Sequence, residues 1–139
     1  MTRVPVRCAL ALMLAAAPAG GADLTVEVTG DAPAGMVRAM VFADADGFAT
    51  QTHPVAAFAV APRDGRVRVT VADLPPGPYA VAAYQDVNGN QQLDRTSLGV
   101  PAEPYAFSRD ARPGLGPVSF DEAAVAMPDG GLVVPLRLR

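Results

Sequence analysis

The sequence predicts an all-β fold, an antiparallel β-sandwich of about six to seven strands with one long irregular loop and one short helix. Three observations predict it. Short segments either alternate apolar and polar residues or are continuously apolar, turn residues separate them at intervals of about 8 to 12 residues, and no long segment has the period of a helix. The 139 residues, 50% of them hydrophobic, suffice for one core.

Residues 1–22 are typical of a signal peptide. Two arginines precede an apolar run at residues 8–17, and small residues follow, so cleavage is expected after Ala22 or, alternatively, after Ala19. The apolar run is about half the roughly 20 residues that a membrane-spanning helix needs. We therefore expect export to the periplasm, or secretion, of a single domain of residues 23–139 that does not insert into the membrane.

The charge distribution narrows the classes of partner. The sequence has 14 acidic residues, all after position 22, and 11 basic ones, all of them arginines. Nucleic acids and anionic membrane surfaces bind basic patches, whereas these arginines are interspersed with acids. We expect no nucleic acid partner. Cations are more natural small partners, and the larger partner is expected to be a protein or a glycan of unknown identity.

The first half predicts two strands and a loop. Residues 23–30 alternate apolar and polar side chains, as a half-buried strand does. Residues 36–43 are apolar on both faces apart from Arg38, which predicts a strand covered on most of both sides. Residues 44–54 are expected to form a loop that begins with an acidic turn, Asp44–Gly47.

Two further segments predict a hairpin. Residues 55–61 and 66–72 flank an Asp-Gly turn at positions 62–65, the strongest hairpin signal in the sequence. A second turn at residues 74–77 then leads into the apolar run 78–85, which we expect to be the central strand. Counting alternating strands places the acidic turn after the second strand and the end of this central strand at opposite ends of the sandwich.

The last part of the chain predicts one helix and one strand. Ser119 and Glu122 have the spacing of a capping box, so residues 119–126 are expected to form a short helix that packs against a sheet end. Residues 132–138 alternate again, and Pro135 marks them as an edge or terminal strand.

Residues 86–118 contain four prolines and no clear strand. Structureless loops longer than about 15 residues are uncommon in compact domains and are usually functional or disordered. This segment has more apolar residues than disordered segments do. We therefore expect an ordered excursion that folds back over the sandwich.

Five oxygen-bearing side chains occupy alternate positions at the start of this loop, namely Asp86, Asn88, Asn90, Gln92 and Asp94. The pattern resembles the first part of an EF-hand or dockerin calcium loop, in which alternate side chains converge on one ion. It departs at the sixth position, where Gln91 replaces glycine, and at the twelfth, where Ser97 replaces a bidentate glutamate. The hypothesis is a Ca²⁺ site of about 10⁻⁴ to 10⁻³ M at best, completed by Glu103, Asp110 or a carbonyl. The alternative is an Asx-rich turn whose side chains bond its own backbone amides.

Aromatic residues concentrate in the second half of the sequence, with Arg95, Arg109 and Arg112 nearby. If exposed, they could stack on a sugar or clamp an anionic ligand, and if buried, they form the core. The residues that we name for a metal-free carbohydrate or small-molecule site are Glu103, Tyr105 and Arg109, with Tyr105 expected to be partly exposed.

Catalysis has little support in the residues. His53 is the single histidine, so a multi-histidine zinc site cannot be built within this chain. A Ser-His-acid triad would need Ser97, Ser108 or Ser119, none of which lies in a recognisable nucleophile turn. We expect no enzyme, and a hydrolase is the third candidate.

Three segments, at residues 74–94, 99–112 and 116–125, closely resemble a family of small exported bacterial proteins catalogued as a domain of unknown function, and the resemblance covers residues 23–139. The LPPGPY turn is also similar to that of transthyretin-like and carboxypeptidase-regulatory-like sandwiches, which agrees with a transthyretin- or immunoglobulin-like arrangement. The resemblance implies no activity. We therefore expect an exported binding or accessory module.

Overall fold

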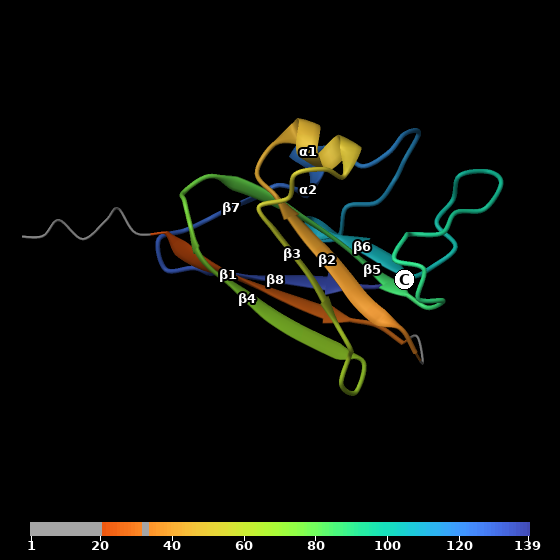
Figure 1. Ribbon diagram of the computed structural model, residues 1–139. Helices are drawn as coiled ribbons and strands as arrows, with labels where there is room; N and C mark the ends of the chain where they lie inside the picture. The colour runs from red at the N-terminus through yellow and green to blue at the C-terminus, as the bar shows by residue number, and fades with distance from the viewer. Residues whose placement is uncertain (1–20, 32–33) are drawn as a thin grey trace, which may run out of the picture.

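In the computed structural model, residues 21–31 and 34–139 are described, and they form two sheets that pack face to face (Figure 1). The three-stranded sheet has the order β4-β1-β8, formed by β1 (Ala22–Thr29), β4 (Arg66–Leu74) and β8 (Leu132–Arg137). The other sheet has the order β3-β2-β5-β6, formed by β2 (Met36–Phe42), β3 (Ala56–Val60), β5 (Pro78–Asp86) and β6 (Tyr105–Phe107). The short strand β7 (Val125–Ala126) pairs with one end of β5. The predicted all-β sandwich is confirmed.

The predicted signal peptide lies outside the described residues up to position 20, and its expected last residue, Ala22, begins β1. Within the part of the chain that the structure describes, no helix is long and apolar enough to cross a membrane.

The main core lies between the two sheets. Every second residue of β1 faces it, and Leu24, Val26 and Val28 are completely or almost completely buried. The period of two in residues 23–30 is therefore confirmed. The facing sheet contributes alternate residues of β2 and β5 to the same core, including Val41 and Val81.

A second apolar cluster covers the outer face of the larger sheet at one end. There, α1 (Ala45–Thr50) and α2 (Phe120–Ala123) pack on β2 and β5 (Figure 1). The cluster consists of Phe42, Phe48, Ala80, Ala82, Val118 and Ala123. Because β2 and β5 are thus covered on both faces at this end, both strands read as nearly continuous apolar runs.

The predicted hairpin of residues 55–61 and 66–72 is wrong. The turn itself forms, with Asp64 and Gly65 at φ 51° and 72° and two backbone hydrogen bonds of 2.9 and 3.0 Å between Arg63 and Arg66. However, β3 pairs with β2 and β4 pairs with β1, so the turn connects the two sheets. Local turn chemistry determines how the chain reverses, whereas partner strands far away in the sequence determine the sheet that each arm joins.

The loop expected at residues 44–54 contains a helix, which corrects that prediction. Asp44 caps α1 by accepting a 2.6 Å hydrogen bond from the Gly47 amide, and Phe48 is buried against Phe42 at 5.7 Å between ring centroids. The helix has six residues and includes a glycine, so its sequence shows no clear helical period.

The long segment 86–118 is ordered as expected but also contains β6 and a 3₁₀ helix, η1 (Ser108–Asp110). Alternation over three residues is too short to identify β6 from sequence. The capping box at Ser119 is confirmed, since its hydroxyl accepts from the Glu122 amide at 3.3 Å while Glu122 accepts from the Ser119 amide at 2.7 Å. The helix ends earlier than expected because Val125 joins β7.

The edges of the sandwich differ. β8 is an edge strand, as Pro135 predicts, but it runs parallel to β1, so the sheets are not purely antiparallel as expected. On that side Tyr105 and Arg139 exchange two backbone hydrogen bonds of 3.2 Å, which join the two sheets.

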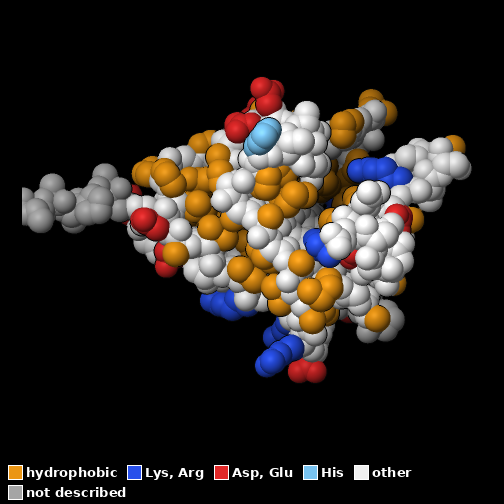
Figure 2. Space-filling model, in the orientation of Figure 1, with side chains coloured by type: hydrophobic (Ala, Val, Ile, Leu, Met, Phe, Trp, Pro, Cys, Tyr) orange, Lys and Arg blue, Asp and Glu red, His pale blue; other side chains and the backbone are white. Residues whose placement is uncertain are grey.

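The opposite side is bounded by β3 and β4, and hydrophobic side chains gather over the middle of the face on which β3 lies (Figure 2).

Candidate functional site

The candidate site is built around the segment that leaves the sheet after β5 and returns at β6. Asp86, the last residue of β5, is 1% exposed. Its Oδ2 accepts hydrogen bonds from the Gln91 amide at 2.8 Å and from Nε of Arg38 at 3.2 Å, whereas its Oδ1 is buried with no hydrogen-bond partner among the described residues. Burial alone would raise the pKa of Asp86, but the bonds from Gln91 and Arg38 and the charge of Arg38 lower it below its usual value.

The neighbouring side chains bond within the loop. The side-chain amides of Asn88 and Asn90 both donate to the Asp94 carboxylate, the second at 2.6 Å. The Oδ1 atoms of Asn88 and Asn90 accept from the backbone amides of Asn90 and Gln92 at 3.2 and 3.0 Å. These are Asx turns. Among residues 21–31 and 34–139, no three carboxylate, imidazole or thiol side chains come together as a group that could hold a metal ion.

Glu103 is buried beneath this loop and accepts hydrogen bonds from its backbone. The side chain is 7% exposed, and its two oxygens accept from the amides of Val87 at 3.0 Å and Asp94 at 3.1 Å. The structure thus places Glu103 under the loop. Arg109 lies apart from it, because its guanidinium donates to the carbonyl of Asp121 at 3.4 Å, beside α2. Tyr105, partly exposed as expected, is the one of the three predicted ligand residues that lines a groove.

This groove lies on the outer face of the larger sheet, beyond the cluster of α1 and α2. It consists of two adjoining hollows of about 430 and 680 Å³. The first lies over β2 and β5 between α1 and residues 91–95, and the second lies between residues 98–101 and 112–118. We call the two together the outer groove. Both hollows share Leu93, Arg95, Tyr105, Phe107, Pro117 and Val118.

The floor of the outer groove is a set of aromatic rings in edge-to-face contact. The ring centroid of Phe107 lies 5.7 Å from that of Phe48 and 5.8 Å from that of Tyr105. The guanidinium of Arg112 stands over the Tyr105 ring at 5.7 Å from its centroid. Such contacts fix the ring orientations, so the floor is preformed.

The rim of the outer groove carries apolar side chains that the core does not use. Leu98 is 89% exposed, Val100 is 57% exposed, and Leu115 is fully exposed. All three line the larger hollow. Contiguous exposed apolar groups around a concavity are typical of ligand sites.

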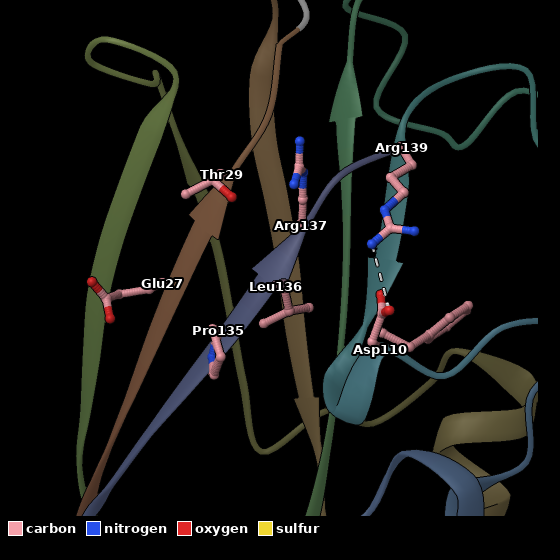
Figure 3. A pocket seen from close by; sticks show the side chains of 8 residues that line it. Glu27, Thr29, Asp110, Pro135, Leu136, Arg137 and Arg139 are labelled. Carbon is pink, nitrogen blue, oxygen red and sulfur yellow. Dashed lines mark ion pairs between the residues drawn. The ribbon is translucent and has the colours of Figure 1, made fainter.

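A third hollow, of about 330 Å³, lies between β8 and η1 (Figure 3). Its side chains include Glu27, Asp110, Arg137 and Arg139. Asp110 pairs with Arg139 at 3.6 Å, as Figure 3 shows, and with Arg112 at 3.0 Å. Because its acidic and basic groups are mixed and partly paired, this hollow favours neither sign of ligand charge.

The remaining candidate residues lie elsewhere. The acidic turn Asp44–Gly47 is at the opposite end of the sheet from Asp86, as expected, since Phe42 pairs with Ala80 and Met36 with Asp86. His53 is exposed between α1 and β3. The hydroxyl of Ser108 is fully buried and bonds to backbone groups of β5 and α2.

Sequence reasoning named Arg95 among the arginines near the aromatic residues, but it missed Leu98 and Leu115 as groove residues. Apolar side chains in a loop rich in proline and glycine could have indicated these residues. Such a loop contributes little to the core, so its apolar side chains are candidates for binding.

A family model described as "Uncharacterized protein conserved in bacteria (DUF2141)" matches residues 26–134. No curated protein and no solved structure matches the chain.

Proposed function

The chain belongs to the DUF2141 family of uncharacterized conserved bacterial proteins, and on that premise we propose that it is an exported, non-catalytic binding module whose outer groove holds a small ligand. The observation that carries the proposal is the outer groove itself, in which a preformed aromatic floor meets an exposed apolar rim. Small-molecule sites are typically concave and mostly apolar, with a few polar groups that orient the ligand. The proposed ligand is a carbohydrate or another small molecule.

Export is supported by the composition of residues 1–22, which have the basic start, apolar run and small-residue end of a signal peptide. A periplasmic or secreted protein meets small molecules and glycans, which suits a binding module.

The 87–104 loop supplies one wall of the groove, and its own hydrogen bonds shape that wall. The amide of Ala102 donates to the carbonyl of Asp94 at 2.7 Å, and the amide of Thr96 donates to that of Val100 at 2.8 Å. The buried carboxylates of Asp86 and Glu103 hold the start of the loop. A wall fixed in this way binds without first ordering, which favours affinity.

The test uses N-phenyl-1-naphthylamine, a neutral aromatic dye whose fluorescence rises in apolar sites. Ala49 lines the groove from α1, so Ala49→Trp fills the smaller hollow, whereas Ala45→Trp adds the same bulk to an exposed position on the same helix that does not line it. We expect saturable binding that Ala49→Trp weakens at least tenfold and Ala45→Trp does not. Equal binding by all three proteins would refute the groove as the ligand site.

A Ca²⁺ ion in the loop after β5 is a second candidate, as an organiser of the groove wall. The observation that favours it is the Oδ1 of Asp86, a buried carboxylate oxygen with no hydrogen-bond partner among the described residues. The residues that would supply ligands are Asp86, Asn88, Asn90, Gln92 and Asp94. Their present bonds within the loop, and the charge of Arg38 at Asp86, would compete with the ion.

Thermal unfolding in 10 mM Ca²⁺ and in EDTA tests this second candidate. A ligand present at a hundred times its Kd stabilises the folded state by about 2.7 kcal/mol, a rise of several degrees for a domain of this size. We expect the rise to disappear in Asp94→Asn. Coincident melting curves for the wild-type protein would exclude calcium binding in this concentration range.

A further inference from the structure

The charges that line the outer groove all have one sign. Two charged side chains line it, Arg95 and Arg112, and no aspartate or glutamate does so among the described residues. The whole chain, by contrast, has a formal net charge of −3. A cationic groove in an acidic protein favours an anionic ligand, because the field inside the groove opposes that of the rest of the surface.

Arg95 is the free cation of the pair. Arg95 lines both hollows. Its guanidinium makes one hydrogen bond to the described residues, from Nη1 to the carbonyl of Gly99 at 3.0 Å. None of the ion pairs among those residues includes Arg95. The remaining N–H groups of Arg95 are therefore available to a ligand.

The acids of the same loop make no ion pair with Arg95, because each of them bonds to other groups. Asp86 accepts from Arg38 and Gln91, Asp94 accepts from two asparagine side chains, and Glu103 accepts from two backbone amides. These bonds keep the three carboxylates out of the groove lining, where Arg95 remains without an acidic partner among the described residues.

Arg112 has a different role. Its Nη2 donates to Asp110 at 3.0 Å, and its guanidinium lies over the ring of Tyr105. The carboxylate of Asp110 balances its charge, so Arg112 contributes a flat surface and stiffens the floor. Figure 2 shows basic side chains at its right, between two protruding segments of the chain.

From this arrangement we propose that the outer groove binds amphipathic anions: small molecules with an apolar or aromatic body and one acidic group, a carboxylate, sulfonate or phosphate. The body lies on the Tyr105 and Phe107 rings and extends into the smaller hollow beside Ala49, and the acidic group accepts hydrogen bonds from Arg95. The guanidinium suits all three acids, because its planar N–H groups match their oxygens. This inference rests on the proposed function, since it names the ligand class of the same groove.

The experiment compares two dyes that differ by one sulfonate. N-phenyl-1-naphthylamine is neutral, and 8-anilinonaphthalene-1-sulfonate is the same molecule with an acidic group. We expect the sulfonate to bind on the order of tenfold more tightly, the effect of one partly exposed charge-assisted hydrogen bond, and the preference to shrink as salt is added.

Substitutions at Arg95 assign the preference to this residue. We expect Arg95→Gln to abolish the preference and Arg95→Glu to reverse it, with the preference measured for each variant as the ratio of its affinities for the two dyes. The matched control is Arg66→Gln, which removes a charge from an exposed arginine at the start of β4, in the other sheet. Because Arg95 is exposed, we expect the melting curves of its variants to match that of the wild type, which checks that each variant is folded.

Two outcomes would overturn the inference, and they are distinguishable. If the wild-type protein binds both dyes equally at the groove, with both weakened by Ala49→Trp, the anion preference is refuted and the binding module stands. If neither dye binds, or if Ala49→Trp affects neither, the groove is not the ligand site and both proposals fail.

Discussion

The carboxylate of Glu103 accepts a 3.1 Å hydrogen bond from the backbone amide of Asp94, nine residues earlier in the chain. Its other oxygen accepts a 3.0 Å bond from the amide of Val87. One buried side chain thus fastens two points of the loop that forms a wall of the outer groove. A carboxylate suits this position because each of its oxygens can accept from a backbone donor.

Replacing Glu103 with glutamine tests that role. In Glu103→Gln the side-chain NH₂ group faces one of the two backbone N–H donors and cannot accept a hydrogen bond from it. We expect the free energy of unfolding to fall by about 1 to 3 kcal/mol. Amide hydrogen exchange should accelerate at residues 87–94 before it does in β5. Glu27→Gln is the control, since Glu27 pairs with Arg68 on the exposed face of β1 and such pairs contribute about 0.2 to 1 kcal/mol. Unchanged exchange in the loop would contradict the role.

Ser108 connects three elements through one hydroxyl. Its Oγ accepts from the amide of Val81 at 2.9 Å and donates to the carbonyl of Ala123 at 2.6 Å. We expect Ser108→Ala to cost about 1 to 3 kcal/mol in chemical denaturation, because it leaves two buried backbone groups without this partner. Ser97→Ala, at an exposed position, should have no measurable effect. Equal stability of the two variants would contradict this role of the Ser108 hydroxyl.

Asp86 makes stability depend on acid pH. Its pKa is lower in the folded protein than the unfolded value of about 3.9, so its contribution is complete above that value and is lost as pH falls through the folded pKa. We expect Asp86→Asn to be less stable than the wild type at pH 7 and the two to converge in denaturation experiments below about pH 3.9. A stability difference that stays constant down to pH 2 would contradict this.

Gly65 lies in the turn that connects the two sheets. Its φ is +72°, and a Cβ there would lie 2.7 Å from the carbonyl oxygen of Gly30. We expect Gly65→Ala to lower the free energy of unfolding by about 1 to 2 kcal/mol, the cost of a left-handed alanine, with additional strain from that contact. Gly130→Ala is the control because nothing lies within 4 Å of its Cβ position. Melting temperatures of the two variants compare them directly, and equal values would refute the strain.

Strands that bury alternate residues were predictable from sequence. The pairing of strands with partners far away in the sequence was not. Leu24, Val26 and Val28 identify β1 because one face meets the core. The Asp-Gly turn predicted a hairpin because such turns usually join two strands that pair with each other. Here β3 pairs with β2 and β4 pairs with β1, and no pattern near the turn indicates these partners. α1 and β6 were missed because six and three residues are too few to show a period.

The candidate site was predictable in part. The sequence identified the loop after Asp86 as a candidate site. The alternative to a metal site was an Asx-rich turn, and the hydrogen bonds of Asn88 and Asn90 to backbone amides agree with that alternative. The sequence also singled out Tyr105. It named Arg95 together with Arg109 and Arg112 but could not rank them, because an arginine without an ion-pair partner looks the same in sequence as one with a partner. Burial of Glu103 was likewise invisible, since it follows from how the returning segment folds under the loop.

The pairing of β1 with β8 has a consequence for how the protein acquires its structure. The first strand of the sheet takes as its neighbour the last strand in the sequence, and these two run parallel. Until residues 132–137 have emerged, β1 has a bare edge and the main core lacks Val134 and Leu136. The smaller sheet is therefore complete only when residues 132–137 pair with β1, a contact between segments far apart in the sequence. Contacts of this kind slow folding, and until they form the bare edge can be captured by other strands.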